Sequence, residues 1–490
     1  MQYSIESLAT AIDQAIDNQD LDQLNSFVSL CQNEVEGVPD AIRYFFQANC
    51  FNALGQAKHK NSEDRLSWQQ DESVQEVLAL RRAIAHPSFI EVNDIWKCKI
   101  YTNLGNCLSF LGRICEAIRQ WDHALEVIPN FAMAFGNRGQ CLLSYGGCLY
   151  DKGHSNVLAF EAAKSFKTAI QQKALWDSGD QPEHRRVFNE SLNSIEQYLK
   201  AVQYDENFDF DQWALGRNKE ETDYRRWVLS AGLFLSPLND AIELSVAAQD
   251  ILHLPNHRYD IDEETRFPNY FNIMKQEYVS ARFMFYQSEN DFDESHFSDK
   301  DVLLMDGFDY ANFGYTHELL KTAFKLSYSI FDKIALFLKD YFQIKMEVDK
   351  VNFRSIWAVK ENKEFKLNPV FSESQNWPLR GLYYISKDFF DKNFQDASLP
   401  EAKELSIVRN QLEHRYLSIT EFGNSSVKNS DIHAHITIDD LRHKTLRLLR
   451  NAREGLIYLS LAMHREEKLR AEKKSNEMTV PISGIPIRRD

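Results

Sequence analysis

The sequence has few of the features that mark membrane, fibrous or disordered chains. Its 490 residues include only 18 Gly and 12 Pro, which favours helices over loops and disorder. No stretch reaches the roughly 18 uninterrupted apolar residues of a membrane span, and the N-terminal segment lacks the basic and apolar regions of a secretory signal. We therefore expect a cytoplasmic protein of two or three domains with no contact to a membrane.

The cysteines lack the spacing of a metal or disulfide site. All seven lie in the first third of the chain, none forms a C-x-x-C pair, and several fall within helical patterns. In a reducing compartment such residues are small buried hydrophobes. We expect neither a metal nor any other cofactor.

Positive charge is scarce over most of the chain. The formal net charge is −16, which repels a polyanion and argues against a protein that coats nucleic acid. Residues 441–490 are the exception, with twelve Lys or Arg against six Asp or Glu. Any contact with nucleic acid is therefore expected near this C-terminal region.

A repeated pattern occupies the first 200 residues. Within residues 100–130 the spaced aromatic, small and apolar positions are Tyr101, Leu104, Gly105, Leu108, Ala117, Trp121, Ala124 and Pro129. These spacings resemble the tetratricopeptide repeat (TPR), a helix-turn-helix unit of about 34 residues. Gly105 and Ala117 allow two helices to approach closely, Trp121 fills the groove, and Pro129 ends the second helix.

A second unit of this kind follows the first, and a weaker one precedes it. The second unit is marked by Phe135, Gly139, Leu142, Ala162, Phe166 and Ala169. Its Gly-rich insertion, SYGGCLYDKGHSN, predicts a longer turn between the two helices. The alternative is a series of generic helical hairpins. Residues 1–204 are thus predicted to form a TPR-like helical solenoid.

The remainder of the chain divides into a connector, a bundle and a tail. Residues 205–315 show broken periodicity and an acidic stretch, and predict a connector with some helix. Strong three- and four-residue periodicity returns within residues 316–475, in the segments 316–342, 379–392, 398–419 and 437–474. Four amphipathic segments joined by loops predict a helical bundle. Residues 476–490 are expected to be a flexible tail.

Start signals precede the third and fourth of these helices. Ser398 and Glu401 are three residues apart with Pro400 between them, and Thr437 and Asp440 repeat the spacing. Such pairs satisfy the unpaired N–H groups of a first helical turn.

The third predicted helix carries polar groups suited to chemistry. At about 100° per residue, its core-facing stripe consists of Leu405, Val408, Leu412 and Tyr416. Asn410 and His414, four residues apart, share the opposite face, and Arg409 lies on the shoulder between. The same R-x4-H spacing occurs at Arg81 and His86 in the repeat region. Spacing alone therefore does not define a site.

An arginine, a polar residue and a histidine in the third helix of a C-terminal bundle resemble the motif of the HEPN domain. This family is named from higher eukaryote and prokaryote nucleotide-binding proteins, and the resemblance covers residues 316–475. A TPR-like arm in front resembles an arrangement of bacterial HEPN proteins linked to defence and stress. The resemblance implies an all-α chain in which a TPR-like solenoid is followed by a HEPN four-helix bundle. It also implies that the protein is a metal-independent endoribonuclease that acts on RNA as a homodimer.

The three residue types fit that chemistry. Histidine, with a pKa of about 6.5, can take or give a proton in RNA cleavage. We therefore expect His414 to be the general base or acid. Arginine stays charged and matches phosphate oxygens, so Arg409 would stabilise the transition state. Asn410 would orient the imidazole or a phosphate oxygen. Pairing of two third helices across a twofold axis would bring two such sets into one cleft.

Two further groups of residues are open to more than one interpretation. Arg442, Lys444, Arg447 and Arg450 recur at helical spacing, as either an RNA-binding phosphate track or a solvated face. His433 and His435 have no neighbouring Cys or carboxylate pair, and predict a polar surface loop beside the cleft rather than a metal site.

Two functions from different classes follow. The first is an endoribonuclease effector, a toxin or antiviral defence protein, whose TPR-like arm binds a protein or peptide partner that controls it. The alternative is a non-catalytic TPR scaffold or adaptor whose HEPN bundle dimerises or binds nucleotide or RNA. Arg409 and His414 discriminate between them, because only the enzyme requires both.

Overall fold

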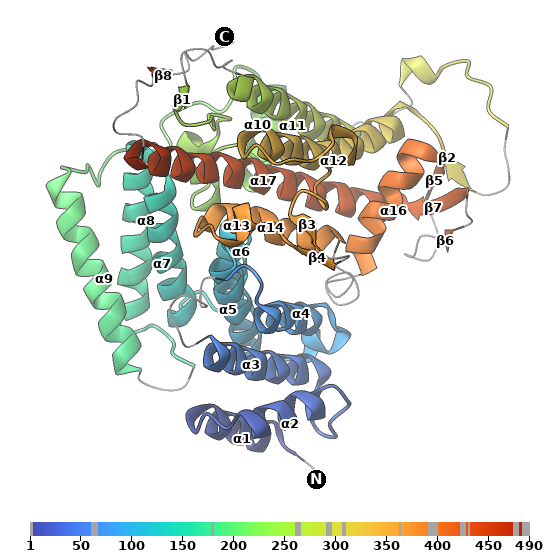
Figure 1. Cartoon of the computed structure of the whole chain (residues 1–490). Helices are drawn as coiled ribbons and strands as arrows, with labels where there is room; N and C mark the ends of the chain where they lie inside the picture. Colours follow the sequence, from blue (N-terminus) through green and yellow to red (C-terminus); the bar gives the residue numbers. More distant parts are fainter. Residues whose placement is uncertain are drawn as a thin grey trace. The chain divides into compact units, whose positions relative to one another are not determined.

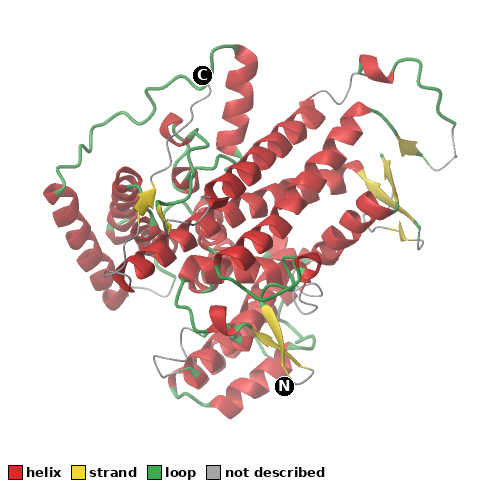
Figure 2. Ribbon diagram, turned by 45° about the horizontal axis from the view of Figure 1, so that its top comes forward, coloured by secondary structure: helices red, strands yellow, loops and turns green. Residues whose placement is uncertain are grey.

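The computed structural model of the chain is mainly helical, with few and short strands (Figures 1 and 2). It describes residues 3–59, 67–177, 181–259, 266–290, 296–305, 310–361, 364–390, 400–421, 428–429, 432–473 and 480–482. The all-α class predicted from the sequence is confirmed. The chain divides into two compact units: residues 1–208 with 369–400, called unit 1, and residues 209–368 with 401–490, called unit 2.

Unit 1 is built from successive antiparallel helices. These are α1 (Ile5–Asp17), α2 (Leu21–Cys31), α3 (Asp40–Lys58), α4 (Asp71–Ala85), α5 (Asp94–Phe110), α6 (Ile114–Val127), α7 (Ala132–Cys148), α8 (Lys152–Ile170) and α9 (Pro182–Ala201). Helices α3 and α4, α5 and α6, and α7 and α8 pack as hairpins (Figure 1). This arrangement is compatible with the predicted repeats. Six of the seven cysteines are buried and none forms a disulfide.

Close helix contacts occur where the repeat pattern places small residues. A Cβ atom added to Gly105 would lie 2.7 Å from the Trp121 ring, so only glycine allows α5 to approach α6 this closely. Trp121 itself is buried. The predicted long turn in the second unit is wrong, because α7 continues to Cys148 and α8 begins at Lys152. Its glycines are mostly helical, and Gly146 lets α7 pass close to the Ser155 carbonyl.

The helix α14 (Trp377–Phe390), which follows the short α13 (Pro369–Ser372), belongs to unit 1. Its Asp388 accepts hydrogen bonds from Arg81 Nη1 at 2.7 Å and from Arg113 Nη1 at 2.7 Å, and Arg81 also bonds Glu116 at 2.9 Å. Burial raises the pKa of Asp388, but the two guanidinium groups outweigh burial and hold that pKa below its ordinary value. This buried network fixes α14 against α4 and α6.

Unit 2 contains α10 (Lys219–Ser230), α11 (Arg266–Asn290), α12 (Tyr315–Tyr341), α16 (Pro400–His414) and α17 (Ile438–Lys473). Helix α11 packs along α12, and both contact α17 (Figure 1). Every residue of α17 from 451 to 463 is buried, so this helix is central to the core of unit 2. Its Arg453 donates to Asp240 at 2.5 Å and to the Phe234 carbonyl at 2.6 Å.

A small sheet in unit 2 follows the end of α16. Its strands are β2 (Ala311–Asn312), β5 (Tyr416–Thr420), β6 (Lys428–Asn429) and β7 (His433–Thr437), in the order β2-β5-β7-β6. Strands β5 and β7 are parallel, and the other pairs are antiparallel. Two further antiparallel pairs are β1 (His257–Tyr259) with β8 (Val480–Ile482), and β3 (Ala358–Glu361) with β4 (Glu364–Leu367).

The structure corrects the expected membership of the bundle. Three of the four expected helices are present in unit 2 as α12, α16 and α17, but α14 packs in unit 1. Helix α11, from the segment interpreted as a connector, packs along α12 instead. Periodicity identifies an apolar helix face, but several partners can cover such a face. The division at residues 204 and 315 therefore stays a prediction, and only 480–482 of the expected tail is described.

The start signal of the fourth helix is confirmed. Thr437 Oγ1 accepts a hydrogen bond from the Asp440 amide at 3.2 Å, which caps the first turn of α17. Ser398, expected to do the same for the third helix, lies outside the described residues; α16 begins at Pro400.

Candidate functional site

Helix α16 presents the predicted motif beside the core of unit 2. Leu405 and Val408 are buried, as the predicted stripe requires. Leu412 is only half-buried, and Tyr416 is 71% exposed because it lies in β5 rather than on the helix. Gln411, 2% exposed, occupies the buried position at this end of the helix instead. The predicted stripe is therefore correct for the first half of α16 and wrong for the second.

The Arg409 guanidinium is held by two carboxylates and one aromatic ring. Nη2 lies 3.3 Å from Asp332 Oδ2, and Nε lies 3.1 Å from Glu413 Oε2. The guanidinium carbon is 4.8 Å from the centre of the Tyr328 ring, a distance suited to a cation–π contact. Burial raises the pKa of Tyr328 to about 12, so the phenol stays neutral under the cation. Arg409 thus joins α16 to α12.

His414 is the last residue of α16 and its side chain is 72% exposed. Its Nε2 lies 3.7 Å from Glu413 Oε2, the same oxygen atom that Arg409 Nε approaches. One carboxylate oxygen therefore lies between the arginine and the histidine of the motif. Asn410 is exposed, and among the described residues no hydrogen bond joins it to His414.

Glu413 is the residue that the sequence reasoning missed. It follows Arg409 by four positions, the spacing at which helical side chains meet, and this spacing is the signal that predicts the contact. The structure brings Arg409, Glu413 and His414 together at the C-terminal end of α16. A carboxylate beside an imidazole can orient the ring.

The predicted phosphate track on α17 is only partly accessible. Lys444 is 4% exposed, and a buried ammonium group does not offer its charge to a phosphate at the surface. Arg442, Arg447 and Arg450 are half-buried. Arg442 Nη1 lies 3.4 Å from Asp439 Oδ1 within the same helix. The track stays a prediction for these three arginines, whereas the burial of Lys444 argues against its inclusion.

The sequence predicts that His433 and His435 lie in a loop, but the structure places them on strand β7. In the part of the chain that the structure describes, no group of three or more His, Cys, Asp or Glu side chains is arranged to hold a metal ion. In the same residues, no helix combines the length and the apolar character needed to cross a lipid bilayer.

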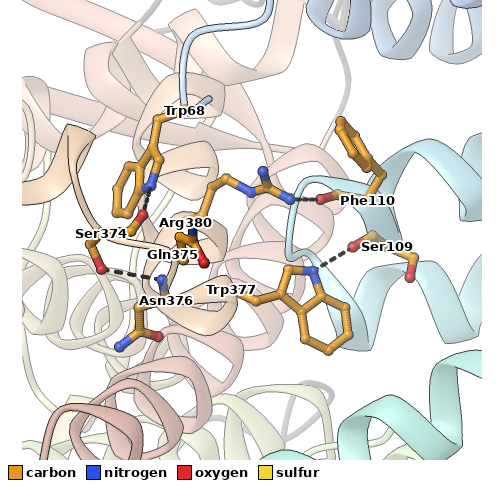
Figure 3. Close-up of a pocket in the computed structure, with 8 residues that line it drawn as sticks. All are labelled: Trp68, Ser109, Phe110, Ser374, Gln375, Asn376, Trp377 and Arg380. Carbon is orange, nitrogen blue, oxygen red and sulfur yellow. Dashed lines mark hydrogen bonds between the residues drawn. The ribbon is translucent and has the colours of Figure 1, made fainter. Parts of the chain in front are cut away.

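A pocket of about 290 Å³ lies in unit 1 (Figure 3). Its lining consists of Trp68, Ser109, Phe110, Ser374, Gln375, Asn376, Trp377 and Arg380. Its two indole groups and its arginine donate to backbone carbonyls: Trp68 Nε1 to Ser374 at 2.7 Å, Trp377 Nε1 to Ser109 at 2.7 Å, and Arg380 to Phe110. These bonds fasten the start of α14, and we assign the pocket a packing role.

Comparison with known proteins identifies the domain that carries the motif. Residues 258–466 match the family model of the LA2681-like HEPN domain. The match runs from β1 through most of α17 and includes all of α16. No curated protein and no solved structure matches the chain. The arginine–histidine motif of α16 therefore lies in a segment that is similar to the LA2681-like HEPN domain.

Proposed function

We propose that the chain is a metal-independent endoribonuclease whose reacting groups include Arg409, Asn410 and His414. The observation that carries the proposal is the shared carboxylate oxygen of Glu413, which lies 3.1 Å from Arg409 and 3.7 Å from His414. A cation and an exposed imidazole thus lie close together at the end of one helix, within a segment similar to a HEPN domain. Phosphodiester cleavage without a metal requires a cation that stabilises charge and groups that transfer protons.

The reaction would be transfer of the phosphoryl group to the neighbouring 2′-oxygen. A neutral imidazole takes the proton of the 2′-hydroxyl, the O2′–P bond forms, and the P–O5′ bond breaks. A protonated imidazole then gives its proton to the 5′-oxygen. The products are a 2′,3′-cyclic phosphate and a 5′-hydroxyl, and the guanidinium of Arg409 would stabilise the charge on the phosphorus oxygens at the transition state.

Arg409 has to exchange partners for this role. Its guanidinium is paired with Asp332 and Glu413, so a phosphate would replace at least one carboxylate. Its side chain is 32% exposed, and a partly exposed ion pair is held by only about 0–1 kcal/mol. An incoming phosphate dianion or diester oxygen can therefore compete for the cation.

The wider assignment extends this activity to regulation and assembly. RNA is the proposed substrate, and two copies of the chain are proposed to pair through their HEPN domains, so that two motifs face one cleft. The helical hairpins of unit 1 would bind a protein or peptide that controls the nuclease. We place this effector in the cytoplasm, as a toxin or an antiviral defence protein.

A second candidate function is favoured by the contacts of Arg409. Because its guanidinium joins α16 to Asp332 and Tyr328 of α12, it also serves helix packing. A non-catalytic HEPN scaffold, binding nucleotide or RNA or only dimerising, would use the arginine in this way. Such a protein would not depend on His414, which is exposed and contributes little to packing.

Inducible expression distinguishes the two candidates. Cells expressing the wild type, His414→Ala, Arg409→Ala or the matched surface control His123→Ala would be followed for growth, with total RNA analysed on a sequencing gel. The nuclease predicts growth arrest and discrete RNA fragments for the wild type and the control, and neither for the two motif variants. The same phenotype in all four strains, with RNA fragments in each, would contradict the assignment.

A further inference from the structure

Strand β5 follows the motif of α16 directly in the chain, and it pairs with β7. Helix α16 ends at His414 and β5 begins at Tyr416. Tyr416 is the register partner of His433, and Ser418 is the register partner of His435. His414 precedes Tyr416 by two residues, and Tyr416 lies opposite His433 on the neighbouring strand, at a spacing of about 4.8 Å. The backbones of His414 and His433 are therefore close.

The two strands alternate between a buried and an accessible face. Leu417, Ile419, Ala434 and Ile436 are buried. The residues between them point to the opposite face, where Tyr416 is 71% exposed and Ser418, His433 and His435 are half-buried. One side of the sheet is thus a core surface, and the other presents a tyrosine, a serine and two histidines.

The imidazoles on this face are held in place. Ser418 Oγ and His433 Nε2 form a hydrogen bond of 2.7 Å across the two strands. The ring centres of His433 and His435 are 4.4 Å apart. Contacts of this kind fix the ring orientation of His433, as a group that transfers protons requires.

We propose that this face is the RNA-binding half of the nuclease site, with Tyr416 stacking on a base and His433 supplying the second proton-transfer group. The inference rests on the proposed function and adds a catalytic residue to it. In the cleavage step, His414 and His433 share the two transfers: the neutral ring takes the 2′-hydroxyl proton and the protonated ring gives its proton to the 5′-oxygen. Ser418 and His435 are positioning residues.

The chemistry of the face suits single-stranded RNA. An exposed tyrosine ring stacks on any base, because every base has a π face. Among the described residues, His435 neighbours His433 on β7, Tyr416 is the register partner of His433 on β5, and Lys428 of β6 is the register partner of His435. With His433 in place, a single protomer supplies both imidazoles.

The test uses the purified full chain and two fluorescein-labelled RNA 20-mers of mixed sequence, one unmodified and one fully 2′-O-methylated so that it binds without being cleaved. The variants are His433→Gln, Tyr416→Ser and Tyr416→Phe, with His123→Gln, an exposed histidine of unit 1, as control. Single-turnover cleavage rates are measured from pH 5 to 9, and affinity for the methylated RNA is measured by anisotropy.

We expect a bell-shaped pH profile for the wild type and the control. His433→Gln should lose one limb of the profile and about 10²–10⁴-fold in rate, with unchanged affinity for the methylated RNA. Tyr416→Ser should weaken that affinity by about 5- to 100-fold, and Tyr416→Phe should restore it, because the ring and not the hydroxyl stacks.

The outcomes separate the inference from the proposed function. Cleavage by the wild type with unchanged rates, profile and affinity in the variants overturns the inference and leaves the nuclease. If the wild type binds RNA without cleaving it, the nuclease assignment and the proton-transfer role of His433 are both overturned. In that case, the affinity of Tyr416→Ser for the methylated RNA decides whether this face binds RNA. A wild type that neither binds nor cleaves RNA overturns both.

Discussion

Two arginine–histidine pairs with the same spacing occur in the chain, and their surroundings differ in every respect that bears on chemistry. Arg81 of α4 is bonded to Asp388 and Glu116, with only 10% of its side chain exposed. His86 follows α4 and points elsewhere, with Nδ1 at 2.8 Å from Ser88 Oγ and Nε2 at 3.4 Å from Asp40 Oδ2. This pair shares no group, and its arginine is sealed in the core of unit 1.

The pair in α16 is arranged in the opposite way. Arg409 and His414 approach the same oxygen of Glu413, and His414 is largely exposed. Cleavage of a phosphodiester needs a proton-transfer group that substrate can reach and a cation close to it. Of the two pairs, only this one joins its arginine and a largely exposed histidine through a shared carboxylate. The comparison teaches that a short motif acquires meaning from what its side chains contact, which spacing does not reveal.

Replacing the histidine of each pair should give the largest difference between them, and this difference is in the rate of RNA cleavage. His414→Ala is expected to lower the rate of RNA cleavage by about 10²–10⁴-fold, because a proton-transfer group is lost. His86→Ala should leave the rate unchanged. Both rates would be measured on the same labelled RNA under single-turnover conditions. Equal losses in the two variants would show that the effect comes from folding and not from chemistry.

Removing the two arginines should have the opposite ranking: the free energy of unfolding should fall more for the variant at Arg81 than for the variant at Arg409. Arg81→Met leaves Asp388 and Glu116 buried with one cation fewer, and is expected to cost about 3–5 kcal/mol. Arg409→Met removes a partly exposed ion pair and should cost about 1 kcal/mol or less. Guanidinium chloride unfolding followed by circular dichroism would give both values. A larger loss for Arg409→Met would mean that this arginine is primarily a packing residue.

A buried carboxylate of α4, the helix that carries Arg81, extends the comparison to pH. Glu76 is 5% exposed and accepts from Asn52 Nδ2 at 3.1 Å, and burial raises its pKa to about 7. Its folded pKa lies above its unfolded pKa, so stability falls as pH rises between the two values. Glu76→Gln should therefore stabilise unit 1 by about 3 kcal/mol at pH 8 and by less than about 1 kcal/mol at pH 5. The same gain at both pH values, in denaturant titrations, would rule out a buried charge as the cause.

Neutralising the carboxylate next to each arginine should give the smallest effect on catalysis. Glu413→Gln keeps the shape of the side chain but removes the charge shared by Arg409 and His414, and is expected to slow cleavage by about tenfold with little change in RNA affinity. Glu116→Gln, the counterpart beside Arg81, should leave the rate unchanged and lower stability instead. If Glu413→Gln cleaves at the wild-type rate, the shared carboxylate has no part in positioning His414.

Sequence reasoning succeeded where the information is local. The helices now seen as α12, α16 and α17, and the cap that Thr437 provides, follow from periodicity and from side chains one turn apart. The location of Arg409, Asn410 and His414 on one helix follows for the same reason. These features need no knowledge of which elements meet in three dimensions.

The failures concern pairings between distant segments. The apolar face of α14 predicts a helix, but its place in unit 1 depends on Arg81 and Arg113, some 270 or more residues earlier in the chain. The His-Ala-His segment is polar enough to resemble a loop, and it becomes a strand because β5 pairs with it. Lys444 has the spacing of a surface residue, yet it is buried on α17. Burial of a charge depends on tertiary neighbours that periodicity does not specify.

The most direct test of the central claim is the chemistry of the RNA ends. Purified wild type, His414→Ala and His86→Ala would be incubated with total RNA in excess EDTA, and the fragment ends identified by their sensitivity to acid and to polynucleotide kinase. We predict 2′,3′-cyclic phosphate and 5′-hydroxyl ends from the wild type and from His86→Ala, and intact RNA with His414→Ala. Fragments with 3′-hydroxyl and 5′-phosphate ends, or cleavage that persists in His414→Ala, would contradict the account.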